Sequence, residues 1–559
     1  MPKLSAVCVA VLVLLGAPAV HAQEAPGAAQ VAQSAQSTAA RLDALFSASY
    51  KPTEPGATVI VVKDGKTLLR KAYGIADTVG MTPLEPGMVL RLGSITKQFT
   101  ATAILMLVDE GKLALSDDIT RFFPDYPTRG KKITVEHLLT HTSGIASYTS
   151  RQEYGLTMGS DMTVAQMIDS FKNAPLDFEP GTAYRYNNSG YFLLGAIIEK
   201  VSGQPYAKFL EQRIFVPLGM KDTAYEGFER SATAHAAGHS PGAKGFEHSA
   251  ALSMTQPYAA GALVSSVDDL ARWDAAVSQG RLLKPASWQR AFTPYTLADG
   301  KSTGYGYGWQ VGTLQGAPQV SHGGAINGFS TYALRLPEQK VFVAVLGNAD
   351  GGLANPGVVA SKAAAIAIGK PFREFREVTL DAATLDRYVG VYEVEKGVTR
   401  TFKREGGVLV MQRSGRPPMR MKAFSQNGFY LPDGYDYFEF AVDGKGKASG
   451  VSQYFDGKEM KQPRIGDVPA ERSAIKIANA AYDKRVGRYQ LAPGFILELS
   501  RDGDRYFAQA TGQGKLEIFA QDENVFFARA VEAEVRFDGG DSSYLVLHQN
   551  GQQIRAPRL

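Results

Sequence analysis

The sequence predicts a multidomain protein: an α/β (α+β) domain with a helical lobe, followed by two small antiparallel β-barrels. Three observations predict this architecture. Strand-like runs occur near both ends of residues 41–369, with helix-like and loop-like segments between them. From residue 383 onward, the chain consists of short alternating runs separated by Gly and Asp turns. This later part also contains an internal repeat, which assigns one barrel to residues 383–466 and a second barrel to residues 480–559.

The composition of the 559-residue chain excludes two broad classes of protein. Hydrophobic residues make up 44% of the chain, which is enough apolar material for folded cores, so a wholly disordered protein is excluded. The 60 Lys and Arg residues are interspersed with 55 Asp and Glu residues, and the net charge is only +5. Because no basic stripe stands out, we expect no nucleic-acid partner.

The N-terminal residues are typical of a secretory signal peptide. Lys3 precedes the apolar run 6–16, and Val20-His21-Ala22 is a small-x-small cleavage site. The apolar run is shorter than the roughly 20 residues that cross a bilayer, and no later segment is apolar enough to do so. We therefore expect residues 1–22 to be removed, which gives an exported protein, periplasmic or secreted, with no integral membrane segment.

Removal of the signal also removes the single cysteine of the chain. Cys8 lies inside the apolar run, so the mature chain would have no disulfide, no thiol nucleophile and no thiolate metal site. Residues 23–40 are rich in Ala, Gln and Ser, and we expect a flexible leader there. Globular patterning begins at Arg41.

Two pairs of strand-like runs predict a single sheet built from both ends of the α/β domain. Runs 58–62 and 67–73 form an early hairpin, and runs 330–336 and 341–346 form a late one. The Ala-rich run 358–368 follows as a closing helix. Because a domain of this length exceeds the usual size, we expect two lobes with a cleft between them.

The internal repeat predicts that the two barrels are duplicates. Asp386 aligns with Asp483 at an offset of 97 residues. The same offset aligns Val389, Gly390, Tyr392, Arg404 and Gly406 with Val486, Gly487, Tyr489, Arg501 and Gly503. A solenoid repeats every 20–50 residues or so, so this longer period indicates a duplicated domain. A closed barrel would hide all of its strand edges.

A Ser-x-x-Lys sequence begins the first long helix of the α/β domain. Apolar residues recur every four positions from Ile95 to Leu107, and Ser94 and Lys97 stand at the start of this pattern. The i, i+3 spacing puts the hydroxyl and the amine on one face, where a partly desolvated Lys97 can activate Ser94 as a nucleophile. A helix N-terminus also favours a developing oxyanion. The alternative is an N-cap serine beside a solvated lysine.

Two further segments supply groups that such chemistry requires. Tyr186 can act as a general base if a neighbouring cationic lysine lowers its pKa, and Asn188 offers both a donor and an acceptor to a substrate amide. The glycines of His322-Gly323-Gly324 allow a substrate backbone to lie against the edge of the late strands. The alternatives are a buried tyrosine beside an asparagine turn cap, and an ordinary glycine turn.

Taken together, these elements resemble serine β-lactamases and penicillin-binding proteins, most closely the class C-like branch that includes esterases, DD-peptidases and D-aminopeptidases. The resemblance covers roughly residues 41–369. The matching segments are 91–97, 133–145, 178–181, 186–191, 260–263 and 268–271. The resemblance implies a β-lactamase/transpeptidase-like catalytic domain. Two tandem barrels behind such a domain look like the D-aminopeptidase arrangement, in which the barrels are lipocalin-like.

The third motif departs from the β-lactamase pattern, which is usually Lys-Thr-Gly. His322 replaces a permanent cation, and the motif also loses a hydroxyl; both groups help to hold a substrate carboxylate. A histidine is charged only near or below about pH 6.5 unless its pKa is shifted. This departure disfavours β-lactam hydrolysis and favours peptide or ester substrates that have no carboxylate at that point.

The resemblance implies a two-step acyl transfer with no metal and no organic cofactor. Ser94 attacks a carbonyl group, Lys97 and Tyr186 pass its proton to the leaving group, and water then releases the acyl enzyme. Backbone N–H groups of Ser94 and Ala325 form the oxyanion hole. The residues expected to bind and orient the substrate are Asn188, His322, Gly324 and Ala325.

The expected function is that of an exported serine hydrolase of the D-aminopeptidase or DD-peptidase type, acting on amide or ester bonds. Its partner would be a small peptide, ester or β-lactam-like substrate. A carboxylesterase or a β-lactamase of the same fold is an alternative, as is a non-catalytic ligand-binding pseudo-enzyme. The sequence leaves the oligomeric state open.

The remaining histidines favour no metal site. His137 and His141 stand at i, i+4, but no acid is placed between them as in His-Glu-x-x-His, and the resemblance accounts for both. His235, His239 and His248 share a polar segment without a ligand-rich pattern, and we expect a solvated loop there.

Overall fold

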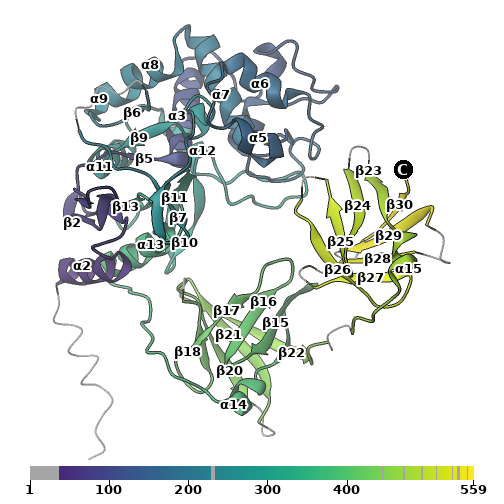
Figure 1. The fold of residues 1–559 in the computed structure, drawn as a ribbon. Coiled ribbons are helices and arrows are strands. Elements are labelled where there is room, and N and C mark those ends of the chain that lie inside the picture. Colours follow the sequence, from purple (N-terminus) through teal and green to yellow (C-terminus); the bar gives the residue numbers. More distant parts are fainter. Residues whose placement is uncertain are drawn as a thin grey trace, which may run out of the picture.

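The computed structural model has an α/β domain followed by two nearly closed antiparallel barrels (Figure 1). It describes residues 37–227, 233–432, 434–442, 446–469, 473–492, 495–511, 513–529, 531, 533–537, 542–549 and 552–559. The expected signal peptide and Cys8 lie outside these residues. Helix α2 begins at Thr38, so its first residues fall within the expected leader at 23–40.

A six-stranded antiparallel sheet forms the centre of the α/β domain, with strand order β10-β11-β12-β13-β1-β2. Its strands are β1 (Ala57–Lys63), β2 (Lys66–Tyr73), β10 (Gln310–Leu314), β11 (Ala317–Ile326), β12 (Phe329–Leu336) and β13 (Val341–Gly347). Strand β1 pairs with β2 on one side and with β13 on the other. This pairing confirms a sheet built from both ends of the domain.

Both faces of the sheet are covered. Along β1 the side chains alternate, so that Ile60 enters the core shared with the helical lobe while Val59 and Val61 enter a second core. Helices α2 (Thr38–Ser49) and α13 (Pro356–Ala367) cover the second core. Every residue of β13 is buried, as expected for a strand between two helical layers.

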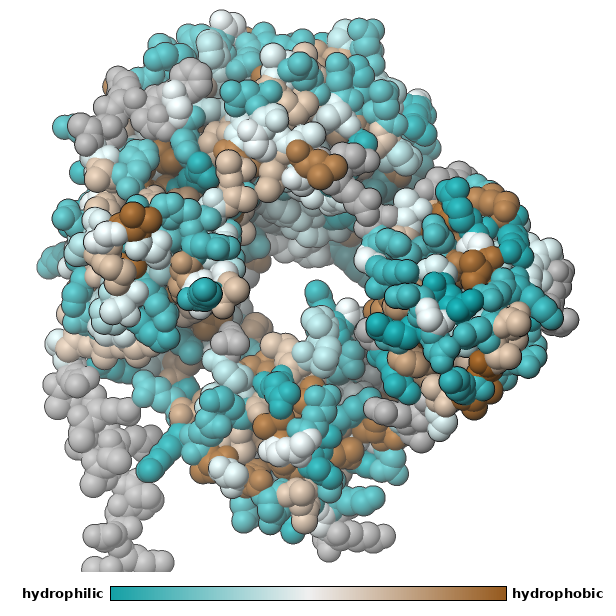
Figure 2. Space-filling model, in the orientation of Figure 1, coloured by the Kyte–Doolittle hydropathy of each residue, from teal (hydrophilic) through white to brown (hydrophobic). Residues whose placement is uncertain are grey.

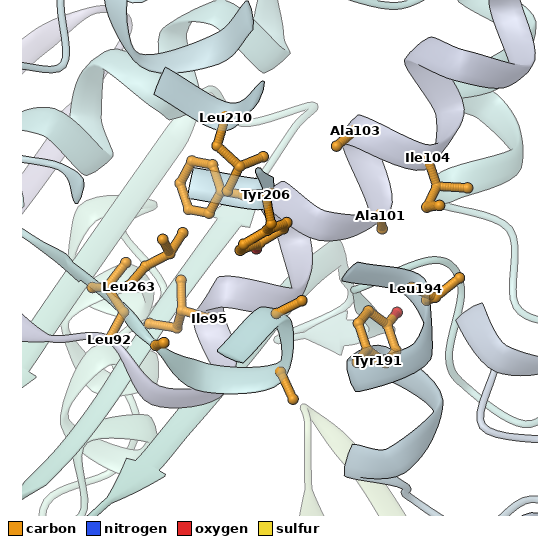
Figure 3. Packing of buried hydrophobic residues seen from close by; sticks show 14 of the residues in the cluster. Leu92, Ile95, Ala101, Ala103, Ile104, Tyr191, Leu194, Tyr206, Leu210 and Leu263 are labelled. Atoms are coloured by element: carbon orange, nitrogen blue, oxygen red, sulfur yellow. The ribbon is translucent and has the colours of Figure 1, made fainter. Parts of the chain in front are cut away.

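Helix α3 (Thr96–Asp109) lies in the centre of the helical lobe, and its residues from Thr96 to Leu107 are all buried. Figure 3 shows part of the surrounding core, including Ile95, Ile104, Leu194 and Leu210. Because the helix is enclosed on all sides, the sequence pattern of one apolar stripe understates its burial.

Shorter elements complete the α/β domain. The helices are η1 (Gly93–Ile95), η2 (Ile119–Arg121), α4 (Val135–Leu139), η3 (Tyr148–Ser150), α5 (Gln152–Thr157), α6 (Val164–Lys172), α7 (Asn188–Ser202), α8 (Tyr206–Leu210), η4 (Glu211–Phe215), α9 (Val216–Leu218), α10 (Tyr258–Gly261), α11 (Val267–Ser278) and α12 (Pro285–Ala291). The short strands are β3 (Ile75–Asp77), β4 (Thr82–Pro83), β5 (Leu90–Arg91), β6 (Ala224–Tyr225), β7 (His239–Gly242), β8 (Gly245–His248) and β9 (Leu263–Ser265). No helix in the described part of the chain is both long and apolar enough to cross a membrane.

Barrel 1 and barrel 2 each begin with one helical turn and continue as consecutive antiparallel strands. Barrel 1 comprises α14 (Ala382–Asp386), β14 (Gly390–Glu395), β15 (Val398–Glu405), β16 (Val408–Arg413), β17 (Met419–Arg420), β18 (Lys422–Ala423), β19 (Gly428–Tyr430), β20 (Tyr437–Val442), β21 (Ala448–Phe455) and β22 (Lys458–Gly466). Barrel 2 comprises α15 (Asn479–Asp483), β23 (Gly487–Ala492), β24 (Phe495–Asp502), β25 (Arg505–Ala510), β26 (Leu516–Ala520), β27 (Val525–Ala528), β28 (Ala533–Arg536), β29 (Tyr544–Gln549) and β30 (Gln552–Pro557).

The two barrels share contacts at the repeat offset. The Tyr392 hydroxyl donates to the Tyr388 carbonyl at 2.9 Å, and the Tyr489 hydroxyl donates to the Arg485 carbonyl at 2.8 Å. Ion pairs recur in the same way, namely Arg404 with Asp386 and Arg501 with Asp483. These paired contacts are the structural counterpart of the sequence repeat.

Barrel 1 contacts the outer end of the β10–β11 hairpin. The Thr313 hydroxyl of β10 donates to the Asp456 carboxylate in the turn before β22. Phe372, in the segment that connects the α/β domain to barrel 1, stacks on Tyr435 with ring centroids 4.4 Å apart. In the view of Figure 2, the three units surround an opening, and polar and apolar residues are mixed over the visible surface.

Candidate active site

Ser94 lies in the turn η1, between strand β5 and helix α3, and is partly buried. The preceding Gly93 has φ +54, and a Cβ atom there would lie 3.0 Å from the Ala325 backbone nitrogen. The turn therefore packs directly against strand β11. This close approach requires glycine for two reasons, the positive φ and the lack of space.

Lys97 is fully buried and makes three hydrogen bonds through its amine. Its Nζ donates to Ser94 Oγ at 3.0 Å, to Asn188 Oδ1 at 2.8 Å and to the Ala260 carbonyl at 2.8 Å. Among the described residues, no carboxylate forms an ion pair with this amine. The alternative of an N-cap serine beside a solvated lysine is therefore wrong.

Burial controls the protonation of Lys97. Desolvation lowers the pKa of the amine well below its ordinary value, because the charged form loses water and gains no anionic partner. The unprotonated amine is therefore more accessible than it is for a lysine in water. Unprotonated, it can accept a proton from the serine hydroxyl that it contacts.

The start of helix α7 brings Tyr186 and Asn188 to the same place. Asn187 caps the helix, with its side chain accepting the Gly190 N–H at 2.7 Å. Asn188 accepts from Lys97 and donates through Nδ2 to Thr149 Oγ1 at 3.1 Å. The asparagine cap that the sequence left as an alternative therefore exists, but it is formed by the residue beside Asn188.

The structure corrects the expected acidity of Tyr186. Burial raises the pKa of its phenol far above the ordinary value, and the nearby Ser94 hydroxyl opposes that shift only in part. The buried hydroxyl has no hydrogen-bond partner of good geometry among the described residues. The Lys97 amine lies 4.8 Å from the ring centroid, over the ring face. The prediction of a lowered Tyr186 pKa is thus wrong, because desolvation outweighs the lysine.

His322 lies on β11 and is only 2% exposed. Its Nδ1 lies 2.6 Å from the Gly323 carbonyl oxygen, and its Nε2 lies 2.8 Å from the Tyr305 hydroxyl. Because a carbonyl only accepts, Nδ1 carries the proton and Nε2 accepts from Tyr305. Burial lowers the pKa of His322 to about 3, so the ring is neutral at neutral pH. The sequence had placed this change of charge near pH 6.5.

Beyond His322, strand β11 runs beside the serine turn. A Cβ at Gly324 would lie 2.0 Å from the Leu92 carbonyl oxygen, so only glycine fits. Thr331 Oγ1 donates to the same carbonyl at 2.8 Å. Strand β10 pairs with β11 only from Ala317 to Ser321, and no strand of the described chain pairs with the next residues on that side. Ala325 is exposed there.

Three contributors to the site escaped the sequence interpretation. His141 lies with its ring centroid 4.3 Å from that of Tyr186, and its Nδ1 accepts the Asn187 N–H at 3.1 Å. The Tyr305 hydroxyl is hydrogen-bonded to His322, and the Ala260 carbonyl accepts a hydrogen bond from Lys97. Two of the segments had matched the family pattern, but a pattern does not indicate which atoms face the amine.

The other histidines differ in burial. His137 closes a capping box at α4, with its N–H donating to Thr134 Oγ1 at 3.2 Å. His141 follows that helix with φ +60, so the two do not share a helix face. His239 is fully buried, in contrast to the solvated loop expected there, whereas His235 is exposed.

Known proteins are similar to this chain in sequence and in fold. Penicillin-binding protein 4* of Bacillus subtilis is 28% identical over 456 residues, covering 76% of this chain and 98% of its own. D-aminopeptidase of Gluconobacter oxydans is 28% identical over 378 residues, or 66% of this chain and 69% of its own. The octameric penicillin-binding protein homologue from Pyrococcus abyssi superposes with a TM-score of 0.54 and 26% identity, over 78% of this chain and 98% of its own.

A family model extends the match across the α/β domain. Its description is Beta-lactamase, and it matches residues 42–367, which is more than half of the chain. The protein therefore belongs to the beta-lactamase family of serine hydrolases.

Proposed function

We propose that this protein is an exported serine hydrolase that forms an acyl enzyme on amide or ester bonds, with peptides of D-amino acids as its substrates. The observation that carries the proposal is the 3.0 Å contact between Lys97 Nζ and Ser94 Oγ, made by an amine that is fully buried. A nucleophile paired with a desolvated base is the arrangement that serine acyl transfer requires.

In the first step, the Ser94 oxygen attacks the substrate carbonyl carbon while its proton moves to the unprotonated Lys97 amine. The Asn188 and Ala260 oxygens hold that amine in place and stabilise the ammonium that forms. Backbone N–H groups of Ser94 and Ala325 receive the oxyanion, and the close packing of Gly93 against Ala325 supports this placement.

In the second step, the bond between carbonyl and leaving group breaks, and the leaving group needs a proton. Tyr186, whose raised pKa keeps its phenol protonated, donates that proton and regains it from Lys97. Water then attacks the acyl enzyme, Lys97 accepts a proton from the water, and the Ser94 hydroxyl is restored. The phenol thus acts as a proton relay, and the amine is the base.

Strand β11 provides the surface on which a substrate backbone can lie. Its edge past Ser321 has no partner strand in the described chain, so an extended peptide can add to it. Gly324 brings this edge against the serine turn, and Ala325 marks its exposed part. His322 contributes through Tyr305, because both of its ring nitrogens are already bonded.

The charge of the site supports the substrate class. A neutral His322 offers no cation to a substrate carboxylate, which disfavours β-lactams and C-terminal carboxylates at this point. The similarity to D-aminopeptidase of Gluconobacter oxydans adds support for D-amino-acid substrates. Export is supported by the signal-like residues 1–22. N-terminal sequencing of the secreted form should begin at Gln23.

Labelling with a fluorophosphonate, followed by intact-mass analysis, tests the nucleophile. We expect one adduct per chain in the wild type, none in Ser94→Ala, and an unchanged adduct in Ser302→Ala, which removes a hydroxyl from a surface turn. An adduct on Ser94→Ala would place the nucleophile elsewhere. No adduct in the wild type would favour a ligand-binding pseudo-enzyme.

A substrate panel tests the specificity. We expect D-alanine p-nitroanilide to be hydrolysed with a kcat/KM at least tenfold above that of the L-isomer, and nitrocefin to be the poorest substrate. A faster reaction with p-nitrophenyl acetate than with either anilide would indicate a carboxylesterase. Equal rates for the two isomers would remove the D-amino-acid assignment but leave the serine chemistry intact.

A further inference from the structure

Three side chains with metal-ligating atoms meet on one side of the α/β domain, away from the serine turn in the sequence. His239 and His248 lie on β7 and β8, which form a hairpin in which these two residues are direct cross-strand partners. Facing partners in an antiparallel pair project to the same side. Their ring centroids are 5.3 Å apart. Asp77, at the end of β3, is the third member.

The ligating atoms of these residues converge. One ring nitrogen from each histidine and one carboxylate oxygen from Asp77 all lie within 4.8 Å of one another. His248 Nε2 lies 2.8 Å from Asp77 Oδ1. Zinc binds nitrogen and oxygen ligands at about 2.0–2.2 Å in a tetrahedron, so three atoms at this spacing need only small movements to share one ion.

The ligands are also held by outer contacts of the kind found around metal sites. His239 Nδ1 lies 3.1 Å from the Asn348 carbonyl oxygen, so Nδ1 carries the proton and Nε2 has the lone pair, which accepts the Thr78 N–H. The Val79 N–H donates to Asp77 Oδ1 at 2.8 Å. Metal-bound imidazoles usually donate their other N–H to a carbonyl or carboxylate, and ligating carboxylates are hydrogen-bonded in turn.

We propose that Asp77, His239 and His248 bind one Zn²⁺ ion, with water in the fourth position. The half-exposed side chains of Asp77 and His248, 34% and 51% accessible, leave room for that water. Two existing contacts must lengthen: the Thr78 N–H donates to His239 Nε2 at 3.2 Å, and His248 Nε2 lies 2.8 Å from Asp77 Oδ1. Because a carboxylate only accepts, His248 must move its ring proton from Nε2 to Nδ1 before Nε2 can bind the ion. Two nitrogens and one oxygen form a borderline ligand set that favours zinc over calcium or magnesium.

The ion would act as a clamp between segments. The His239 N–H donates to the carbonyl oxygens of Gly328 and Asn348, at 3.2 and 3.1 Å. Gly328 lies in the turn between β11 and β12, which follows the strand that borders Ser94. Bound zinc would therefore join the end of β3 to the β7–β8 hairpin and stabilise the support of that turn. It takes no part in acyl transfer.

Isothermal titration of the full chain, without a histidine tag and stripped of metal, tests this site with ZnCl₂. We expect one Zn²⁺ per chain, and a binding constant at least tenfold weaker in His248→Ala and in Asp77→Asn. Both changes are at partly exposed side chains, so the fold should persist, which thermal unfolding without metal verifies. His235→Ala, an exposed histidine in the same segment, is the matched control and should bind as the wild type does.

A second readout separates this site from chance binding to surface histidines. Zn²⁺ should raise the unfolding temperature of the wild type and of His235→Ala, and leave that of His248→Ala unchanged. The proposal is overturned if the wild type binds no Zn²⁺ at millimolar concentration. It is equally overturned if His248→Ala binds as tightly as the wild type, because the cluster is then only a hydrogen-bonded histidine–aspartate pair.

Discussion

Lys97 in the α/β domain and Arg400 in barrel 1 are both buried cations, and neither forms an ion pair in the described part of the chain. Lys97 donates hydrogen bonds to a hydroxyl, a side-chain amide and a backbone carbonyl. Arg400 bonds two amides, with Nη1 donating to Gln453 Oε1 at 2.9 Å and to Gln462 Oε1 at 2.7 Å. Its Nε is buried and has no hydrogen-bond partner among the described residues.

The same physical cause has opposite consequences at these two sites. Burial lowers the pKa of Lys97 well below its ordinary value, and it lowers the pKa of Arg400 to about 10. The guanidinium therefore remains charged at neutral pH, whereas the amine can lose its proton. Burying a lysine produces a base, and burying an arginine produces a fixed charge that side-chain amides must hold.

Barrel 2 has the same architecture as barrel 1 but no buried cation at the position that corresponds to Arg400. At the repeat offset of 97, Arg400 corresponds to Leu497. Near the ends of the barrels a three-residue gap reduces the offset to 94, so that Gln453 corresponds to Leu547 and Gln462 to Ala556. All three counterparts are buried and apolar. The polar cluster is thus a property of barrel 1, and the barrel architecture itself does not require it.

Replacing Lys97 tests the first half of the comparison most directly. We expect Lys97→Met to lower kcat/KM by about 10⁴-fold, because the serine loses its base while the apolar stem is kept. Steady-state kinetics with the preferred anilide measure the loss. Lys132→Met, at an exposed lysine, is the control and should keep full activity. Retained activity in Lys97→Met would mean that another group deprotonates Ser94.

Introducing a charge into barrel 2 tests the second half. We expect Leu497→Arg to reduce the free energy of unfolding of barrel 2 by about 3–5 kcal/mol, because no amide pair is present to hold the guanidinium. Hydrogen exchange of the β24 and β29 amides in the full chain measures this. Leu497→Met should cost less than about 1.5 kcal/mol. Equal protection in both variants would show that the interior admits water.

His322 adds a third buried titratable side chain to the comparison. Its pKa is about 3 in the folded protein, against about 6.5 when unfolded, so only the unfolded state takes up a proton between these values. Stability should therefore fall as the pH falls through this window, by about 2 kcal/mol from His322 between pH 6.5 and pH 5. His322→Gln should have a correspondingly shallower fall in urea unfolding. An identical pH dependence would mean that the ring is protonated in the folded state.

The smallest effect is expected from converting the interior of barrel 1 to that of barrel 2. Asp436, which accepts from Gln453 at 2.8 Å, belongs to the same cluster and corresponds to Ala533. The combined change is Arg400→Leu, Gln453→Leu, Gln462→Ala and Asp436→Ala. We expect it to lower the stability of barrel 1 by less than about 1 kcal/mol or to raise it, because a complete polar cluster is exchanged for an apolar one. Hydrogen exchange of β15 and β21 would reveal a larger loss.

Much of the architecture could be predicted because it depends on local patterns. The early and late hairpins follow from alternation and turn residues, and the repeat follows from matching residues at one offset. The Ser94–Lys97 contact was predictable because the two residues lie on one helical turn. The other expected residues of the site, such as Tyr186 and His322, were predictable from the order in which their motifs follow Ser94 along the chain.

The protonation states were not predictable, because they depend on packing between distant segments. Tyr186 was expected to have a lowered pKa, yet burial raises the pKa of its phenol, and the rings of His141 and Tyr305 are among those packed around it. Similarly, the pairing of His239 with His248 depends on the register of a hairpin, and Asp77 joins them from far along the chain. Hydrophobic periodicity in the sequence does not predict which titratable side chains are desolvated in the fold.

The crowding around Gly324 has an evolutionary consequence. A side chain at this position would strike the Leu92 carbonyl oxygen, which also accepts a hydrogen bond from Thr331. The strand therefore stays packed against the turn that contains Ser94, and position 324 cannot accept a larger residue. Along this strand, sequence change is expected at neighbouring positions that face outward, of which Ala325 is exposed. Lineages that share this frame should diversify at that neighbour while the glycine stays invariant.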